Sequence, residues 1–98
     1  MAEWTNQTTA TVLTMVKVDL GIKATAYDER LTQYVQTAKA AMDREGASLS
    51  ADVEDMQLVA MYAGWLWRKR DTGDGMPRNL RWMLNNRIFS SKMKTSEE

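Results

Sequence analysis

Residues 56–70 read MQLVAMYAGWLWRKR, a segment of helical composition with apolar residues on nearly every side. On a helical wheel at about 100° per residue, its apolar arc covers roughly 260°, whereas an ordinary surface helix buries an arc of about 100°. Trp65 and Trp67 point roughly 160° apart, so one helix face cannot hold both. The segment therefore predicts a central helix with partners on more than one side.

Two interpretations of this helix stay open. It is either the core helix of a bundle, surrounded by its own chain, or it packs on its own chain on one side and on a neighbouring copy on the other. We favour the second, because only two other long amphipathic helices are visible and each has a single apolar stripe. Tryptophan and tyrosine are also the residues that anchor interfaces. The candidate interface residues are Leu58, Met61, Tyr62, Trp65, Trp82 and Phe89.

The two tryptophans are expected to differ in role. Trp67 shares its side of the wheel with Val59 and Ala63, which face the other predicted helices. Trp65 lies beside Leu58 and Met61, on the arc that the chain has least material to cover. We therefore expect Trp67 to stabilise the monomer and Trp65 to serve self-association.

Helical periodicity and breakers divide the chain into four helices. Their predicted ranges are residues 9–20, 26–45, 51–70 and 77–89. The fold class is therefore all-α, a small four-helix bundle-like domain whose core covers about residues 8–90.

Residues at the helix ends support these bounds. Gly21 and Gly46 occupy stop positions, where a left-handed backbone conformation is common. Thr25 and Ser50 are the expected N-caps of the second and third helices. Pro77 suits the first position of the fourth helix, since proline lacks an N–H that would need a partner there.

The two termini are predicted to be flexible in the free protein, because residues 1–7 (apart from Trp4) and 91–98 lack an apolar stripe. No basic segment followed by an apolar core precedes the first helix, so we expect no targeting signal. The longest nearly apolar run, residues 58–67, is about half the length of a membrane span. We expect a soluble protein, cytosolic when made.

Composition argues against catalysis. The 98 residues allow one domain, and the chain has neither cysteine nor histidine. This removes the thiolate nucleophile, the usual general base near neutral pH and the commonest metal ligands. Adjacent carboxylates such as Glu54 and Asp55 lie near helix starts, where they complement the helix dipole. We therefore expect no catalytic residue, no metal site and no cofactor.

Positive charge is concentrated in the last third of the chain. Residues 68–94 carry eight Lys or Arg and only Asp71 and Asp74, a net charge of +6, although the whole chain is neutral. Such a cluster can contact phosphate groups. The candidate residues for docking or non-specific DNA contact are Arg68, Lys69, Arg70, Arg78, Arg81 and Arg87.

A helix-turn-helix is the sequence-specific alternative for this region, with residues 77–89 as recognition helix. The connection before it is longer than the usual three- to four-residue turn. Trp82 and Met83 are also poor readers of base edges. We therefore expect any DNA contact to be non-specific.

Four short segments, taken in chain order, carry a family resemblance. They are VKVDLGI at 16–22, YDERL at 27–31 with Ala38 and Gly46, YAGWLWR at 62–68, and MPRNLR at 76–81 with LNNR at 84–87. In this order they resemble the head–tail connector (head-completion or adaptor) proteins of tailed phages and prophages. The resemblance covers about residues 12–90.

This resemblance implies a small α-helical virion protein that assembles as a ring on the portal after DNA packaging. It implies a location at the head–tail junction, and in the host cytoplasm during assembly. The partners would be further copies of the chain, the portal protein and a downstream connector, stopper or tail protein, without a membrane. A ring of heterologous contacts needs two different adhesive faces, which fits a helix apolar on nearly all sides. The alternatives are a small helical DNA-binding regulator and a partner-binding module.

Overall fold

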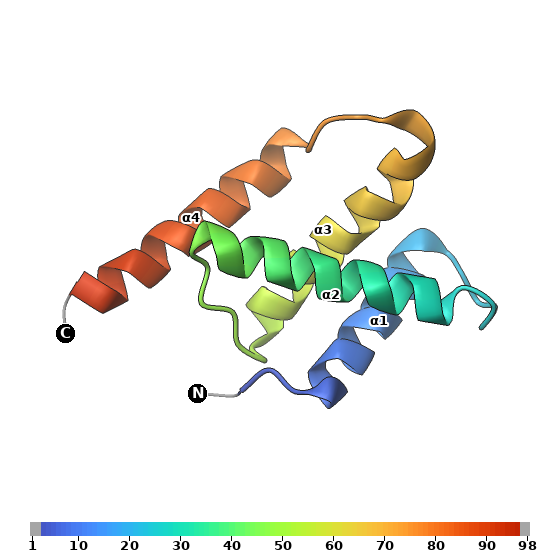
Figure 1. Ribbon diagram of the computed structural model, residues 1–98, viewed down its shortest axis with the longest axis horizontal. Helices are drawn as coiled ribbons and strands as arrows, with labels where there is room; N and C mark the ends of the chain where they lie inside the picture. Colours follow the sequence, from blue (N-terminus) through green and yellow to red (C-terminus); the bar gives the residue numbers. More distant parts are fainter. Residues whose placement is uncertain (1–2, 97–98) are drawn as a thin grey trace.

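Helix α3 (Val53–Thr72) contains the segment 56–70 and lies at the centre of the fold (Figure 1). The computed structural model describes residues 3–96 and, within that range, has four helices and no strand. The other helices are α1 (Asn6–Leu20), α2 (Asp28–Glu45) and α4 (Arg78–Ser96). The predicted all-α class, with four helices in this order, is confirmed.

The core lies where α1, α2 and α3 meet, with α2 lying across the other two helices (Figure 1). Val12 and Val16 of α1 and Val59 of α3 are fully buried. The buried stripe of α2 follows the spacing i, i+4, i+7 and i+11 of one helix face. It consists of Leu31, Val35, Ala38 and Met42. Each fully buried side chain of this size stabilises the fold by about 1.5–3 kcal/mol.

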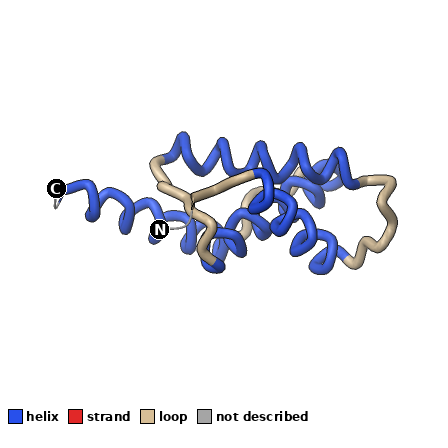
Figure 2. Tube along the Cα trace, turned by 90° about the horizontal axis from the view of Figure 1, so that it is seen from below, coloured by secondary structure: helices blue, strands red, loops and turns tan. Residues whose placement is uncertain are grey.

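Helix α4 lies beside α3, and its C-terminal half extends beyond the other three helices (Figures 1 and 2). Up to Met93, it buries only Leu80, Leu84 and Ser91. The molecule is elongated, with principal extents of 45 × 29 × 18 Å. Most of the surface of α4 therefore remains available to a partner.

Glycines end the first three helices. Gly21, Gly46 and Gly73 all adopt positive φ, with φ of 71°, 109° and 71°. The peptide N–H of Ile22 donates to the carbonyl of Lys17 at 2.9 Å, which satisfies a carbonyl at the end of α1. The stop positions predicted at Gly21 and Gly46 are confirmed.

Two predicted N-caps are wrong. Tyr27, not Thr25, precedes α2, and it makes no side-chain capping bond. Asp52, not Ser50, precedes α3, because the Ser50 hydroxyl donates to Asp55 instead. Pro77 lies one position before α4, where its carbonyl accepts from Arg81 N–H at 3.0 Å.

Both outer helices are longer than predicted. α1 begins at Asn6, because Thr5 and Thr8 form a reciprocal capping box one turn before the predicted start. α4 continues past Phe89 to Ser96, because Ser91 is buried and its hydroxyl accepts from Ser48 N–H at 3.0 Å. The segments predicted to be flexible are therefore helical over 6–7 and 91–96, and residues 1–2 and 97–98 lie outside the described range.

Within residues 3–96, no helix combines the length and the apolar composition that crossing a bilayer demands.

Candidate interaction surface

Helix α4 has apolar residues on two opposite faces. Leu80 and Leu84 face α3 and are buried. Trp82, Phe89 and Met93 lie within about 40° of one another on the helical wheel, on the side opposite Leu80. Their side chains are exposed, Trp82 by 67% and Phe89 by 64%. We call these three residues the outer stripe.

The outer stripe leaves apolar side-chain surface in water. A buried aromatic side chain covers about 150–250 Å², so Trp82 and Phe89 alone leave roughly 250–300 Å² of apolar surface in water. Contiguous apolar surface of a few hundred Å² on a soluble chain is often functional. The spacing i, i+7 and i+11 keeps the three side chains in line over about 16 Å of helix.

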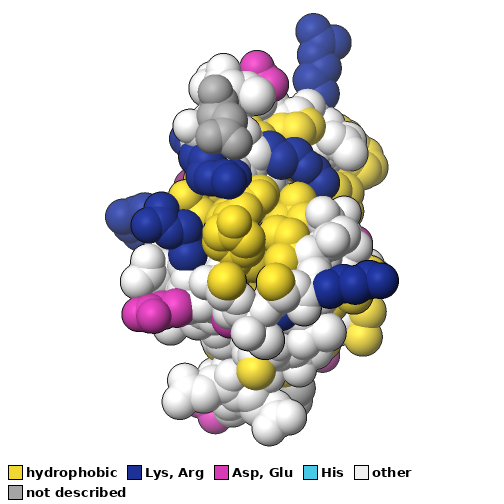
Figure 3. Space-filling model, turned by 90° about the vertical axis from the view of Figure 1, so that its right-hand side faces the viewer, with side chains coloured by type: hydrophobic (Ala, Val, Ile, Leu, Met, Phe, Trp, Pro, Cys, Tyr) yellow, Lys and Arg dark blue, Asp and Glu magenta, His cyan; other side chains and the backbone are white. Residues whose placement is uncertain are grey.

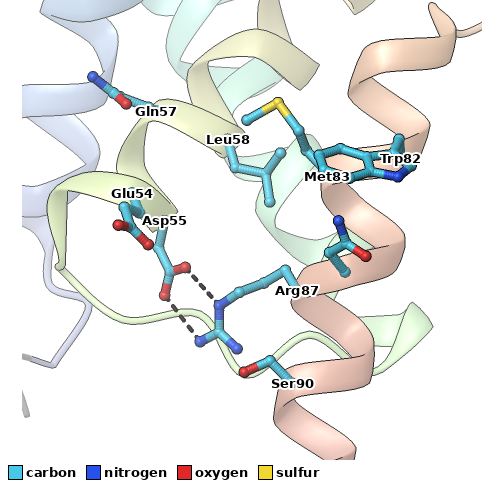
Figure 4. Close-up of a pocket in the computed structure, with 9 residues that line it drawn as sticks. Glu54, Asp55, Gln57, Leu58, Trp82, Met83, Arg87 and Ser90 are labelled. Atoms are coloured by element: carbon cyan, nitrogen blue, oxygen red, sulfur yellow. Dashed lines mark hydrogen bonds and ion pairs between the residues drawn. The ribbon is translucent and has the colours of Figure 1, made fainter.

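An ion pair fixes the inner face of α4 to α3 (Figure 4). Arg87 donates from Nε to Asp55 Oδ1 at 2.7 Å and from Nη2 to Oδ2 at 3.1 Å. Its Nη1 donates to Ser91 Oγ at 2.6 Å, and its Nη2 also reaches the Ser48 carbonyl. The Ser50 N–H and hydroxyl donate to Asp55 at 2.8 and 3.0 Å. We call these residues the Asp55–Arg87 clamp.

The clamp shifts the pKa of both charged groups. Burial disfavours the charged carboxylate of Asp55, but the hydrogen bonds from Arg87 and Ser50 outweigh it and lower its pKa below the ordinary value. The hydrogen bond to Asp55 raises the pKa of Arg87, against the opposing effect of burial. The pair is therefore fully ionised in the neutral range, and α4 is held by charge as well as by apolar contact.

A hollow of about 340 Å³ lies between α3 and α4 beside this clamp. Leu58 lies on the α3 side, while Trp82 and Met83 lie on the α4 side (Figure 4). Two carboxylates line it, Glu54 and Asp55, and Asp55 is engaged by Arg87. Among the described residues, no group of three or more Asp or Glu is placed to hold a metal ion.

A second apolar surface lies between α1 and α3. Met15 and Val18 of α1 and Met61 of α3 border a hollow of about 360 Å³ whose floor includes Ala60. Val18 is 74% exposed, the highest value for any large apolar side chain in the described range. The groove continues along α1 into a second hollow that also contains Val18. We call it the α1–α3 groove.

Two of the predicted interface residues belong to the monomer core. Leu58 is 4% exposed and Tyr62 is 8% exposed, so neither can serve as a surface anchor. They are covered because α4 and its connection pack on the arc of α3 that the sequence left without a partner. Met61 is half-buried and borders the α1–α3 groove, whereas Trp82 and Phe89 are exposed as predicted.

Trp65 is half-buried, and it contacts the connection between α3 and α4 of its own chain. Its indole N–H donates to the carbonyls of Asp74 at 3.2 Å and Gly75 at 3.1 Å, in the connection between α3 and α4. Its ring meets Tyr62 edge-on at 5.4 Å, and Lys69 Nζ lies 4.6 Å from its centroid. The connection at residues 74–75 therefore supplies part of the cover of Trp65, and its role in self-association stays a prediction.

Trp67 packs against α2 on the other side of α3. Its ring is edge-on to Tyr27 at 5.4 Å and to Tyr34 at 6.0 Å, and Arg70 lies 3.7 Å from its centroid. This agrees with its predicted contact with the other helices, although the side chain is only half-buried. Figure 3 views the molecule from its right-hand side in Figure 1 and shows apolar side chains there, bordered by Lys and Arg.

Two of the predicted docking residues form ion pairs with carboxylates of other helices. Arg87 belongs to the clamp, and Arg81 pairs with Glu45 of α2 at 2.8 Å. The others lie where α3 ends and α4 begins, namely Arg68, Lys69, Arg70 and Arg78, all exposed. Arg87 is therefore removed from the docking set, since its guanidinium holds α4 to α3.

Sequence reasoning missed Met93, Met15 and Val18. Met93 was excluded because α4 was expected to end at Phe89, yet its spacing of four from Phe89 is a signal for the same face. Val18 was passed over because it falls outside the buried stripe of α1, which was assigned by its core residues alone.

No protein-family model, no curated protein and no solved structure matches this chain.

Proposed function

We propose that this chain is a head–tail connector protein of a tailed phage or prophage, a structural component without catalytic activity. In this role it forms a ring on the portal after DNA packaging and offers a platform to the next connector, stopper or tail protein. The observation that carries the proposal is the two-faced helix α4, which buries Leu80 and Leu84 inward and exposes Trp82 and Phe89 outward.

Three features support this role. The chain folds into four helices in the order in which the resembling segments occur. Its outer stripe lies on a helix that extends beyond the body, where it can reach a neighbour without steric conflict (Figure 2). The exposed cations Arg68 and Lys69 near the end of α3 and Arg78 at the start of α4 flank one connection, where they can contact a portal surface or passing DNA.

The test is a disruption of the encoding gene in a phage or prophage genome. We expect heads that fill with DNA but carry no tails, because packaging precedes the connector in the proposed order. Supplying the chain from a plasmid should restore tailed particles. Normal tailed particles without the chain, or heads that fail to package DNA, would contradict the proposal.

A DNA-binding regulator is the second candidate, and the charge of α4 favours it. Between Arg78 and Ser96 the chain has five Lys or Arg and no Asp or Glu. The surface that a recognition helix would turn to DNA is nonetheless the outer stripe, and Trp82 and Phe89 offer few hydrogen bonds to base edges. The connector therefore accounts better for the aromatic residues.

A further inference from the structure

We propose that α4 is a releasable strap, which detaches from α3 as one unit while α1, α2 and α3 stay folded. Release uncovers Leu58, which lies on the side of α3 that faces α4 and is 4% exposed in the closed chain (Figure 4). The inference goes beyond the proposed connector function, since it concerns the chain alone and holds whatever partner the chain has.

The first three helices form a core of their own. α1, α2 and α3 contact one another more extensively than α4 contacts α3. The fully buried side chains of this core include Val12 on α1, Leu31 and Val35 on α2 and Val59 on α3. Because these side chains pack where the three helices meet, most of the burial in the core does not depend on α4.

The attachment of α4 contains little apolar burial. Up to Met93, its buried apolar side chains are Leu80 and Leu84, whereas Trp82 and Phe89 are exposed. Segments with few buried apolar contacts open at a lower free energy than the core of the same protein. A small and partly polar interface between two parts of a chain also permits relative motion of those parts. The composition of this interface therefore favours release of α4 before the core unfolds.

Ion pairs hold α4 in the closed position. Arg87 donates to the two carboxylate oxygens of Asp55 at 2.7 and 3.1 Å, and Arg81 donates to Glu45 of α2 at 2.8 Å. Release places both charges of each pair in water, where they are solvated, whereas a substitution leaves one charge behind without its partner. The pairs therefore oppose release by less than the loss that removal of one partner causes.

The connection between α3 and α4 has the features of a hinge. Gly73 has φ of 71°, and an added Cβ at Gly75 would meet no atom within 4 Å. Glycine reaches more backbone conformations than any other residue, so these two positions can absorb a change in the direction of the chain. The indole N–H of Trp65 donates to the carbonyls of Asp74 and Gly75, which holds the connection near α3 while α4 moves.

Amide hydrogen exchange of the full chain, measured for each residue by NMR at a series of low denaturant concentrations, tests the release. We expect the N–H groups around Leu84 and Ile88 to share one protection factor, at least about tenfold below that of the core N–H groups in α1–α3. This protection should fall with denaturant, because opening of a unit exposes surface. A gradient of protection along α4 that does not respond to denaturant would mean fraying of the helix end and would overturn the proposal.

Val12→Ala separates release of α4 from unfolding of the whole chain. Val12 is fully buried in the three-helix core, and it stays packed when α4 is released. Its truncation should therefore lower the protection of the core N–H groups at least about tenfold and leave that of α4 unchanged within about twofold. Equal losses in α4 and in the core would show that the chain opens as a single cooperative unit, which contradicts a releasable strap.

Arg87→Gln tests the attachment itself. It removes the ion pair with Asp55, so the protection of the N–H groups of α4 should fall at least about tenfold. Arg78→Gln is the matched control, because it removes the same charge from the exposed start of the same helix, and it should change that protection by less than about twofold. Unchanged protection in Arg87→Gln would show that the pair does not hold α4 closed.

A thiol gives a second measurement, since the chain has no cysteine of its own. Leu58→Cys places a thiol beneath α4, and Val59→Cys places one in the three-helix core. A buried thiol reacts only when it becomes accessible, so Leu58→Cys should be labelled at least about tenfold faster, after correction for the unfolding free energy of each variant. Equal corrected rates would overturn the proposal. Neither measurement depends on the gene disruption, so the strap and the connector function can fail separately.

Discussion

Asp55 joins three parts of the chain, since its carboxylate accepts from Arg87 of α4 and from Ser50 in the connection before α3. Asp55→Asn should lower the free energy of unfolding by about 2–4 kcal/mol, because it leaves the partly buried Arg87 without a counter-charge. Chemical denaturation of wild type and variant measures this loss.

The matched control is Asp43→Asn, which breaks a largely exposed pair with Lys39 at 2.8 Å, one turn away on the same helix. Such pairs contribute about 0.5 kcal/mol or less, because water screens both charges. Equal losses of unfolding free energy from the two substitutions would show that the Asp55–Arg87 pair stabilises the fold no more than an exposed ion pair does.

The clamp also predicts a dependence of stability on pH. Because the pKa of Asp55 is lower in the folded chain than its ordinary value of 3.8, the folded protein binds this proton less readily than the unfolded chain does. The resulting stability is fully present above the unfolded pKa and is lost as pH falls through the folded pKa.

We therefore expect the stability difference between wild type and Asp55→Asn to stay constant from about pH 7 to pH 5 and to shrink below about pH 4. Unfolding curves at a series of pH values test this. A difference that shrinks near neutral pH, or one unchanged well below pH 3, would contradict the assignment to Asp55.

At the scale of single residues, exposure could be predicted from the sequence but long-range ion pairs could not. The exposure of Trp82 and Phe89 was predictable, because their wheel positions oppose the buried leucines. The Asp55–Arg87 pair was not, since 32 residues separate the partners and only the tertiary fold brings them together. Arg87 therefore looked like one more member of the basic cluster.

The glycine stops at Gly21 and Gly46 are the helix-end feature that was predicted correctly from the sequence, and mutation tests them simply. Gly21 has φ of 71°, and an added Cβ would meet no atom within 4 Å, so any cost of Gly21→Ala comes from the backbone alone. We expect a loss of about 1–2 kcal/mol, the penalty of the left-handed conformation for a residue with a Cβ.

Gly75→Ala is its matched control, since Gly75 also has open space around it but no positive φ. That substitution should be neutral or slightly stabilising, because it restricts the unfolded chain without straining the folded one. Thermal unfolding of both variants measures the two changes in stability. A loss at Gly75 as large as that at Gly21 would mean that conformation is not the cause.

The tryptophans test how α3 is covered. Trp67→Ala should cost about 3 kcal/mol, the lower end for a core aromatic, since Trp67 packs on Tyr27 and Tyr34 but is only half-buried. Trp65→Ala should cost about 2 kcal/mol through loss of its bonds to the connection at residues 74–75.

Trp82→Ala is the control for these two substitutions, because this exposed side chain should change the unfolding free energy by less than about 0.5 kcal/mol. The measurement is denaturant unfolding at a concentration where the chain is monomeric. Unchanged stability in Trp65→Ala, together with weaker self-association, would restore the interface role that the sequence first indicated.

Helix number, order and most of the buried stripes could be read from periodicity, because burial of one face imposes that spacing. Helix lengths could not. α4 continues to Ser96 through a serine that is buried by contact with residues 48 and 87, and a polar residue gives no periodic signal. Because the predicted helix ended at Phe89, Met93 was not assigned to the outer stripe, of which it is one of three residues.

At the scale of the whole molecule, three helices form the core and the fourth serves two purposes. α3 is apolar on nearly all sides, and α1, α2 and α4 all pack against it. The apolar side chains that remain exposed lie mainly on the outer stripe of α4 and along the α1–α3 groove. These two surfaces, beside the half-buried Trp65, are therefore the candidate surfaces for self-association.

The concentration of positive charge predicts how the whole chain meets DNA. Duplexes of unrelated sequence should bind with equal affinity, and the affinity should fall steeply with salt, because contacts made through lysine and arginine displace counterions from phosphates. Arg78→Ala, at the exposed start of α4, should reduce the slope of log K against log salt by about one. Arg30→Ala, which removes the same charge from the exposed start of α2, shows how far a general loss of positive charge changes that slope. Fluorescence anisotropy with several duplexes at several salt concentrations makes the comparison. A defined duplex bound about a thousandfold more tightly than the others at physiological salt would favour the regulator over the connector.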